Sequence, residues 1–234
     1  ICMQEEGVVI REEIEILSVE KDSDGVAVNI REDGIEERVT GSDLLVAAGR
    51  VPNLDGLDLE AAGIEYDRRG IKVDERLRTT NKKVFAIGDA AGSFQFTHVA
   101  GYHAGIVIRN VLFRLPAKVD YSALPWVTYT DPEIAHVGMT EAQAREKHGD
   151  IRVLRHPFAE NDRAQAERKT DGLAKIITTG KGVIVGASIV GPHAGELIQS
   201  WILPIQKKMK IGAVAGLIIP YPTLGEVNKR AAGS

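Results

Sequence analysis

Cysteine is nearly absent from this sequence, which contains Cys2 and no other among its 234 residues. One cysteine cannot form a disulfide within the chain, and it cannot supply a cysteine-based metal site. A chain without disulfides fits the reducing interior of a cell. We therefore expect a cytoplasmic protein.

The sequence also lacks long apolar runs and basic blocks. No apolar stretch approaches the roughly 18–20 residues needed to cross a bilayer. The net charge is −4, and 44% of the residues are hydrophobic, which is ordinary for a soluble globular protein. We expect neither a membrane nor a nucleic acid as a partner.

Complete active-site motifs are missing as well. The chain contains no G-x-G-x-x-G fingerprint, no P-loop, no H-E-x-x-H and no G-x-S-x-G. The run GKG at residues 180–182 joins two strand candidates and therefore predicts a hairpin turn. His98 and His103 are five residues apart, on different sides of a predicted helix, which argues against a shared metal. Taken alone, the residues predict no metal site and no complete catalytic centre.

The two ends of the sequence indicate a fragment. Residue 1 is Ile, and residues 1–7 resemble the tail of a helix that is cut in its middle. Neither a start Met nor a signal peptide appears in the sequence, and Ser234 resembles a second truncation. We expect a longer parent protein.

Residues 84–105 are the most informative stretch. Residues 84–87 have the length and composition of a buried strand, and Gly88 and Asp89 suit a tight turn. From residue 97 an amphipathic pattern predicts a helix with Thr97 as its N-cap. A carboxylate after a strand and before a helix start lies where open α/β sheets bind ligands. This pairing suits a nucleotide cofactor with a polyhydroxyl chain and an anion-forming ring; the alternative is that Asp89 only caps a turn.

The remaining pattern predicts an α/β first half and a compact α+β second half, with a boundary near Lys118. Pro204 is expected to kink or split a helix over residues 194–209. Further predicted helices cover residues 57–63, 140–147 and 211–217. Predicted strands cover residues 7–10, 15–20, 26–30, 37–40, 44–48, 71–74, 126–130, 151–156, 173–179 and 183–190.

Eight stretches, in order, resemble successive motifs of the flavin-dependent pyridine nucleotide-disulfide oxidoreductases. The first three are LVAAGRVPN at residues 45–53, VFAIGDA at 84–90 and FTHVA at 96–100. The others resemble the dimerisation domain of that family: PWVTYTDPEIAHVG at 125–138, PFAENDRA at 157–164, DGLAK at 171–175, GASIVGPHAGE at 186–196 and YPTLGE at 221–226.

This resemblance implies a domain layout and a homodimer. Residues 1–45 would be the last strands of the NAD(P)-binding domain, and residues 46–118 the C-terminal part of the FAD-binding domain. Residues 119–234 would form the dimerisation domain. The missing upstream part would carry both dinucleotide fingerprints and a redox-active cysteine pair.

The resemblance also implies cofactor contacts, with FAD and NAD(P)H expected in the parent protein and weak or absent in the fragment. Asp89, beside Gly88, would hydrogen-bond the ribityl chain of the flavin. The start of the following helix would face the pyrimidine edge of the flavin; this region comprises Gln95, Phe96, Thr97 and His98. Ala47 and Gly49 would lie near the nicotinamide nucleotide.

One position departs from the family pattern. Most disulfide-reducing members have His where this chain has Tyr221, five residues before a Glu that matches Glu226. In them this His–Glu pair comes from the partner subunit and handles protons at the thiolate. A tyrosine, with a pKa of about 10, suits hydrogen-bond donation or contact with a metal–thiolate complex better than general base catalysis. Mercuric reductases of the family carry Tyr at this place.

Three interpretations of function follow. The favoured parent is a mercuric-reductase-like enzyme that reduces a disulfide or an Hg(II)–thiolate substrate, with Tyr221 and Glu226 as catalytic residues. The runner-up is a parent similar to dihydrolipoamide dehydrogenase. In a different class, the fragment itself acts only as a non-catalytic dimerisation module. The choice between NADH and NADPH and the identity of the substrate stay open.

Overall fold

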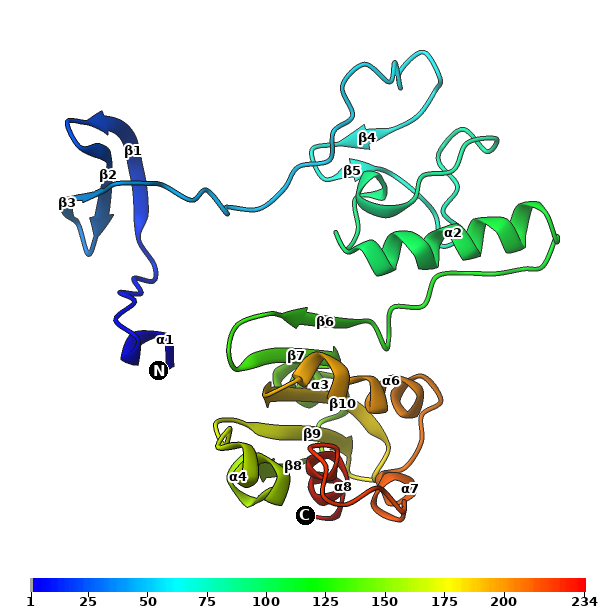
Figure 1. Ribbon diagram of the computed structural model, residues 1–234. Coiled ribbons are helices and arrows are strands. Elements are labelled where there is room, and N and C mark those ends of the chain that lie inside the picture. Colours follow the sequence, from blue (N-terminus) through cyan, green and yellow to red (C-terminus); the bar gives the residue numbers. More distant parts are fainter. Residues whose placement is uncertain (1) are drawn as a thin grey trace.

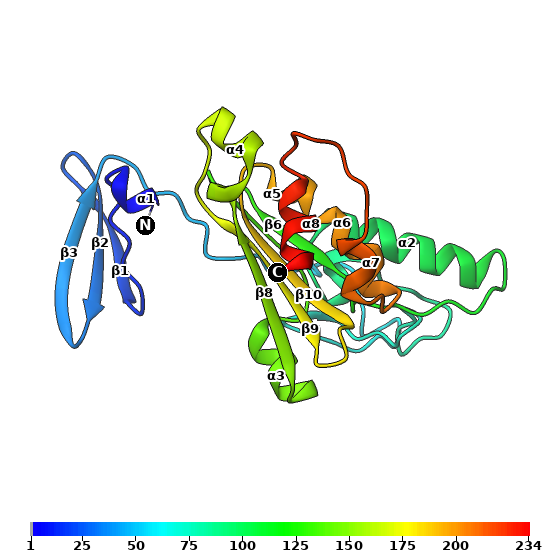
Figure 2. The same cartoon turned by 90° about the horizontal axis from the view of Figure 1, so that it is seen from below.

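The computed structural model describes residues 2–234, which form three parts along the chain (Figure 1). A three-stranded sheet is followed by an extended segment and a small unit around helix α2. A five-stranded sheet with helices forms the C-terminal part. Figure 2 shows the three-stranded sheet apart from the other two parts, which lie side by side.

The N-terminal part begins with the short helix α1 (Cys2–Glu5), while Ile1 lies outside the described residues. The predicted hairpins form the strands β1 (Glu15–Asp22), β2 (Gly25–Glu32) and β3 (Ile35–Gly41). The strands pair antiparallel in the order β1-β2-β3. Residues 7–10 do not form the predicted strand, because no described strand pairs with them and Val9 is exposed.

Two predictions are wrong in the segment that follows. Residues 44–48 form no strand, and Leu45 is 89% exposed, because no described neighbour provides hydrogen bonds or a covering face. Residues 57–63 form turns and not a helix. The reason is local, since Asp58 and Gly63 have positive φ angles of 50° and 67°, outside the helical region.

The middle unit contains few regular elements. Two short strands, β4 (Tyr66–Asp67) and β5 (Gly70–Ile71), pair antiparallel, so the predicted strand at 71–74 is shorter and begins earlier. The predicted strand at 84–87 is reduced to a bridge between Phe85 and Arg78. A 3-10 helix, η1 (Gly88–Ala91), and the helix α2 (Thr97–Val111) follow.

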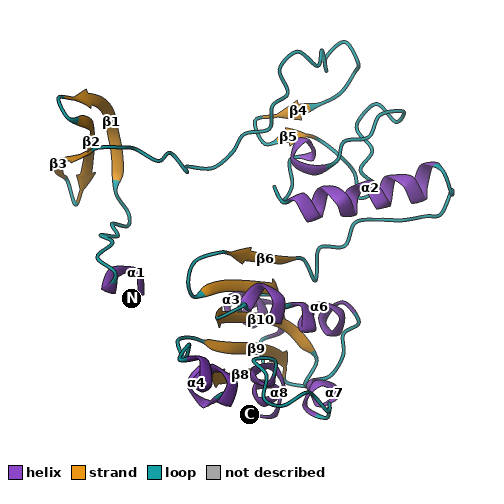
Figure 3. Ribbon diagram, in the orientation of Figure 1, coloured by secondary structure: helices purple, strands orange, loops and turns teal. Residues whose placement is uncertain are grey.

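The C-terminal part is built on one antiparallel sheet (Figure 3). Its strands are β6 (Pro125–Thr128), β7 (Glu133–Gly138), β8 (Ile151–Pro157), β9 (Leu173–Thr179) and β10 (Ile184–Gly191). Their order in the sheet is β6-β7-β10-β9-β8. Residues 180–182 make the predicted hairpin turn between β9 and β10.

Helices follow and connect these strands. They are α3 (Glu141–His148), η2 (Phe158–Glu160), α4 (Asp162–Glu167), α5 (Ala194–Leu197), α6 (Gln199–Gln206), α7 (Ile211–Ala215) and α8 (Glu226–Gly233). Thr140 caps α3 as predicted, in a complete capping box with Gln143. Helix α8 was not predicted, although Val227 and Ala231 are spaced by one helical turn and both are buried.

Of the predicted kink or split at Pro204, the split does not occur. The break lies at Ile198, between α5 and α6, where the amide of Trp201 donates to the carbonyl of Ile198 and tightens the turn. Pro204 lies inside α6, where its missing N–H removes one hydrogen bond without ending the helix.

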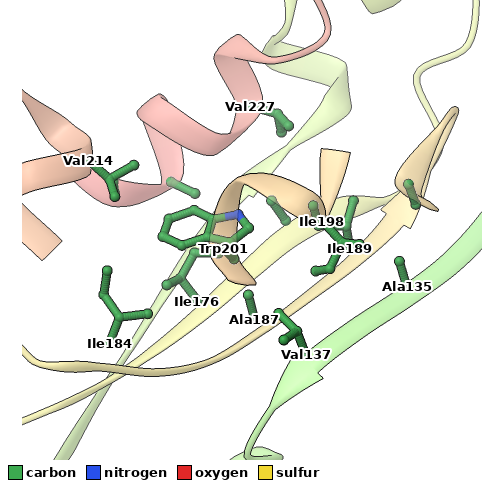
Figure 4. Packing of buried hydrophobic residues seen from close by; sticks show 14 of the residues in the cluster. Ala135, Val137, Ile176, Ile184, Ala187, Ile189, Ile198, Trp201, Val214 and Val227 are labelled. Atoms are coloured by element: carbon green, nitrogen blue, oxygen red, sulfur yellow. The ribbon is translucent and has the colours of Figure 1, made fainter. Parts of the chain in front are cut away.

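Trp201 lies at the centre of the main core (Figure 4). Its ring is fully buried among apolar residues of β7, β9, β10 and the helices α5–α8. Its Nε1 donates a 2.9 Å hydrogen bond to Oδ1 of Asn228 on α8. This single buried ring thus joins α6, α8 and the sheet.

Candidate functional site

The corner formed by η1 and the start of α2 holds most of the predicted cofactor-binding residues. Gly88 has a φ of 62°, and a Cβ added there would lie 3.0 Å from Cβ of Ala100 on α2. A glycine therefore permits both the turn and the close approach of η1 to α2. This packing sets η1, which contains Asp89, against the first turn of α2.

A buried histidine fixes the backbone of this corner. His103, on α2, accepts a 3.1 Å hydrogen bond from the amide of Gly88 at Nδ1, and its Nε2 lies 2.7 Å from the hydroxyl of Tyr121. Since an amide only donates, the proton of the neutral ring sits on Nε2. Burial lowers the pKa of His103 and raises that of Tyr121. No sequence signal indicates this role, because neither residue is the defining residue of a motif.

Asp89 and the first turn of α2 present unused hydrogen-bonding groups. The half-buried Asp89 carboxylate makes no hydrogen bond or ion pair with another side chain of residues 2–234. Phe96, and not Thr97 as predicted, occupies the N-cap position, and it makes no side-chain cap. The amides of Thr97 and His98 have no acceptor within the same residues. A carboxylate acceptor and free helix-start amides fit hydroxyl groups and an anionic edge, respectively.

The Gln95–His98 segment is tied to neighbouring elements. Arg50 donates from its guanidinium to the carbonyl of Gln95, and the side-chain amide of Gln95 donates back to the carbonyl of Arg50 over 3.3 Å. His98 stacks on Phe96 with ring centroids 5.1 Å apart, and its Nε2 lies 3.0 Å from the carbonyl oxygen of Pro125. These contacts link the corner to the segment before it and to β6.

Of the two residues predicted to contact the nicotinamide nucleotide, only one lies near the corner formed by η1 and α2. Gly49 lies with Gln95 in the wall of an open cavity of about 560 Å³, which Arg50, Arg69 and Ser93 also line. Ala47 is exposed and does not line it. The structure therefore brings Gly49, but not Ala47, to the corner.

Tyr221, in the loop between α7 and α8, and Glu226, the first residue of α8, belong to a second cluster. The hydroxyl of Tyr221 donates a 2.9 Å hydrogen bond to Oδ2 of Asp162, the first residue of α4. This hydrogen bond, with the charges of Asp162 and Glu226, raises the pKa of the phenol. Asp162 was not predicted, although it lies inside the motif at residues 157–164.

The two clusters are far apart within one chain. Strand β6 forms one edge of the five-stranded sheet and β8 the other. In Figure 1, α2 lies beyond the β6 edge, whereas α4 and α8 lie at the β8 edge. One copy of the chain does not bring Tyr221 to Asp89.

Two kinds of feature are absent from residues 2–234. They hold no group of three His, Cys, Asp or Glu side chains arranged to bind a metal ion. None of their helices has both the length and the apolar character of a membrane span.

Comparison with known proteins matches both halves of the chain. Residues 2–104 match the family model for pyridine nucleotide-disulphide oxidoreductases, and residues 124–232 match that for their dimerisation domain. Dihydrolipoyl dehydrogenase from Bacillus subtilis is 40% identical over 92% of this chain and 46% of its own length. Mercuric reductase from Bacillus cereus is 35% identical over 91% of this chain and 34% of its own length.

A solved structure extends the likeness to the fold. The HOCl-induced flavoprotein disulfide reductase RclA from Escherichia coli has a TM-score of 0.90 at 28% identity, over 99% of this chain and 53% of its own. That protein has also been solved as a Cu(II) complex.

Fold and motif order thus define an FAD/NAD-linked reductase architecture: α/β in the first half and α+β in the second. The chain belongs to the pyridine nucleotide-disulphide oxidoreductases, a family of enzymes, which confirms the resemblance. It spans about half the length, or less, of the two curated relatives from Bacillus.

Proposed function

We propose that the full protein is an FAD-dependent NAD(P)H oxidoreductase that reduces a disulfide or an Hg(II)–thiolate substrate, with a mercuric-reductase-like preference. The observation that carries the preference is Tyr221, which stands where most disulfide-reducing relatives have a histidine. Family membership supports the wider class of reaction.

The residues of the α2 corner fit a flavin. Asp89 would accept hydrogen bonds from the ribityl hydroxyls, and the free amides of Thr97 and His98 would face the pyrimidine edge. When bound, FAD passes electrons between NAD(P)H and the substrate. The role of this chain is to hold and orient it, with His103 fixing the Gly88 amide at the turn.

Tyr221 suits a role other than proton exchange. A histidine with an ordinary pKa near 6.5 gains and loses a proton near neutral pH, whereas a tyrosine with a pKa of about 10 does not. The contact with Asp162 moves the pKa of the phenol further upward. At neutral pH Tyr221 therefore stays protonated and serves as a polar contact and not as a general base.

The functional unit in this proposal is a homodimer formed through residues 119–234. The separation of the two clusters within one chain supports a homodimer, because a second copy could bring its Tyr221 and Glu226 to the α2 corner of the first. Residues 1–45 and 46–118 would complete the NAD(P)-binding and FAD-binding domains of the parent. The chain by itself would be a dimerisation module that holds flavin weakly.

A dihydrolipoamide dehydrogenase-like activity is the second candidate, favoured by the 40% identity to the Bacillus subtilis enzyme. Lipoamide is a disulfide, and its reduction to a dithiol takes up two electrons and two protons. A phenol with a raised pKa supplies such protons poorly, so we rank this candidate below the first.

Turnover by the full-length protein separates the two candidates. NAD(P)H oxidation would be followed with Hg(II) plus excess thiol, with Cu(II) plus thiol, with lipoamide, and with thiol alone. We expect turnover with Hg(II), and a gain of lipoamide activity in Tyr221→His. Tyr129→Phe removes another exposed phenol and serves as the control. Turnover with lipoamide alone would overturn the mercuric-reductase-like preference, and a full-length protein without flavin would overturn the whole proposal.

A further inference from the structure

Two contacts tie the loop of Tyr221 to the start of α4. The Tyr221 hydroxyl donates to Asp162 over 2.9 Å, and the side-chain amide of Asn161 donates to the carbonyl of Thr223 over 3.2 Å. Asn161 is itself held, because its Oδ1 accepts from the amide of Ala164 as the N-cap of α4. The loop is thus held on both sides of Pro222 by the start of α4, whose N-cap residue Asn161 is buried.

Apart from Asp162, Tyr221 has little to hold its ring in place. The residue is 69% exposed, and no other residue of 2–234 hydrogen-bonds to its hydroxyl or stacks on its ring. An exposed tyrosine without partners samples several side-chain orientations. Within one chain, Asp162 is therefore the contact that selects one of them.

We propose that Asp162 is a positioning and specificity-determining residue, which turns the hydroxyl of Tyr221 so that its lone pairs, and not its proton, face the substrate. The inference rests on the proposed function of Tyr221 and deepens it. A phenol has one proton, and here it is used in the bond to the carboxylate. What remains for a substrate is an electron-pair donor.

The Tyr221 oxygen, as an electron-pair donor, would interact differently with metal–thiolate complexes and with disulfides. The metal of a metal–thiolate complex accepts electron pairs, so the Tyr221 oxygen can contact it directly. A disulfide has no such need, because its reduction requires protons for the two sulfur atoms that leave as thiols. The pair formed by Asp162 and Tyr221 therefore favours metal–thiolate substrates over disulfides.

The test uses four variants of the full-length protein: Asp162→Asn, Asp162→Glu, Tyr221→Phe and the double variant Asp162→Asn/Tyr221→Phe. Glu160→Gln is the matched control, since it removes a nearby carboxylate that does not contact Tyr221. The first readout is the phenol titration at 295 nm, taken as the difference from Tyr221→Phe. We expect the Tyr221 pKa to fall in Asp162→Asn and to be kept in Asp162→Glu and Glu160→Gln, because the contact with Asp162 raises it.

The second readout is kcat/KM for Hg(II)–thiol and for lipoamide. Asp162→Asn should lose about fivefold with Hg(II)–thiol, the equivalent of one hydrogen bond of about 1 kcal/mol. It should lose little with lipoamide, and nothing further in the Tyr221→Phe background. An unchanged phenol titration, equal losses with both substrates, or additive losses in the double variant would each overturn the proposal. A protein that turns over no Hg(II)–thiol contradicts the proposed function instead, and the phenol titration then decides alone whether Asp162 positions Tyr221.

Discussion

The C-terminal part, residues 125–233, and the region before it bury their apolar residues very differently. Within residues 125–233 a single cluster of buried residues joins three strands of the five-stranded sheet (β7, β9 and β10) and five helices (α4–α8) around Trp201. The earlier region has two small clusters around α2 and η1, and its three-stranded sheet buries only Ala27 and Ile30. The C-terminal part supplies its own packing partners, whereas the earlier region leaves apolar strands uncovered.

Leu45 and Val46 show what that difference means. Both are apolar residues of a kind that usually lies in a buried strand, yet both are exposed here. A strand needs a neighbour for its hydrogen bonds and a face to cover its side chains. We infer that the earlier region of the chain is completed by segments outside this sequence, as its place in the family implies.

The largest effect should come from removing the centre of the C-terminal core. Trp201→Ala leaves a cavity and removes the donor to Oδ1 of Asn228, so we expect a loss of about 3–5 kcal/mol in the free energy of unfolding. Urea unfolding of the chain measures it. Leu203→Ala on the same helix, at an exposed position, should cost under about 1 kcal/mol. Equal costs would contradict the described core.

The second prediction concerns the exposed residues 44–48 and compares the effect of one substitution in this chain and in the full-length protein. Leu45→Ser should change the stability of this chain by less than about 0.5 kcal/mol, because the side chain is exposed. In the full-length protein, where we expect a covered strand, the same substitution should cost about 2 kcal/mol or more. Urea unfolding of both proteins gives the two values. A small effect in both would show that the segment is never buried.

The third prediction concerns the cap of α3. Thr140→Ala removes the side-chain acceptor for the Gln143 amide, so we expect a loss of about 1 kcal/mol. Thr140→Ser keeps a hydroxyl and should retain most of the stability. A shift in the urea midpoint without a change in slope would attribute the loss to the folded helix. If Ser and Ala cost the same, the cap contributes nothing.

The smallest effect is a pH dependence from His136 on β7. Burial, together with the charge of Lys175, lowers its pKa in the folded state. As the pH falls below the unfolded value near 6.5, the unfolded state binds the proton more readily, so stability decreases. His136→Gln should show a smaller decrease between pH 7 and 5 than the native chain. His148→Gln, at an exposed position, should keep the native dependence; if it also flattens the curve, His136 is not the cause.

Elements were predictable from the sequence where local pattern and long-range packing agree. The β9–β10 hairpin and the capped helix α3 formed as expected, because their alternation and capping residues act locally. The strands at 44–48 and 84–87 did not form, since a strand depends on partners that a pattern cannot supply. Helix α8 was missed because its buried side chains are mostly small, and the split at Ile198 has no sequence signature.

The candidate site was predictable where a motif carried it. Asp89, Gly88 and the start of α2 lie together as the motif order implied. The supporting residues His103, Tyr121 and Asp162 were not found, because each acts through a contact far along the sequence. Their roles depend on the fold, and only the assembled structure brings them into contact.

We propose that the α2 corner of one copy and the Tyr221 cluster of a second copy work together, and that one chain alone does not complete the site. Full-length Asp89→Ala would be paired with full-length Tyr221→Phe/Glu226→Gln, each with its own affinity tag, and the mixed dimer isolated. In such a dimer one site combines the Asp89→Ala corner with the altered Tyr221 and Glu226, and the other site combines native residues from both copies. We therefore predict about half the native rate of NAD(P)H oxidation with Hg(II)–thiol. A mixed dimer no more active than the two damaged parents would contradict the claim.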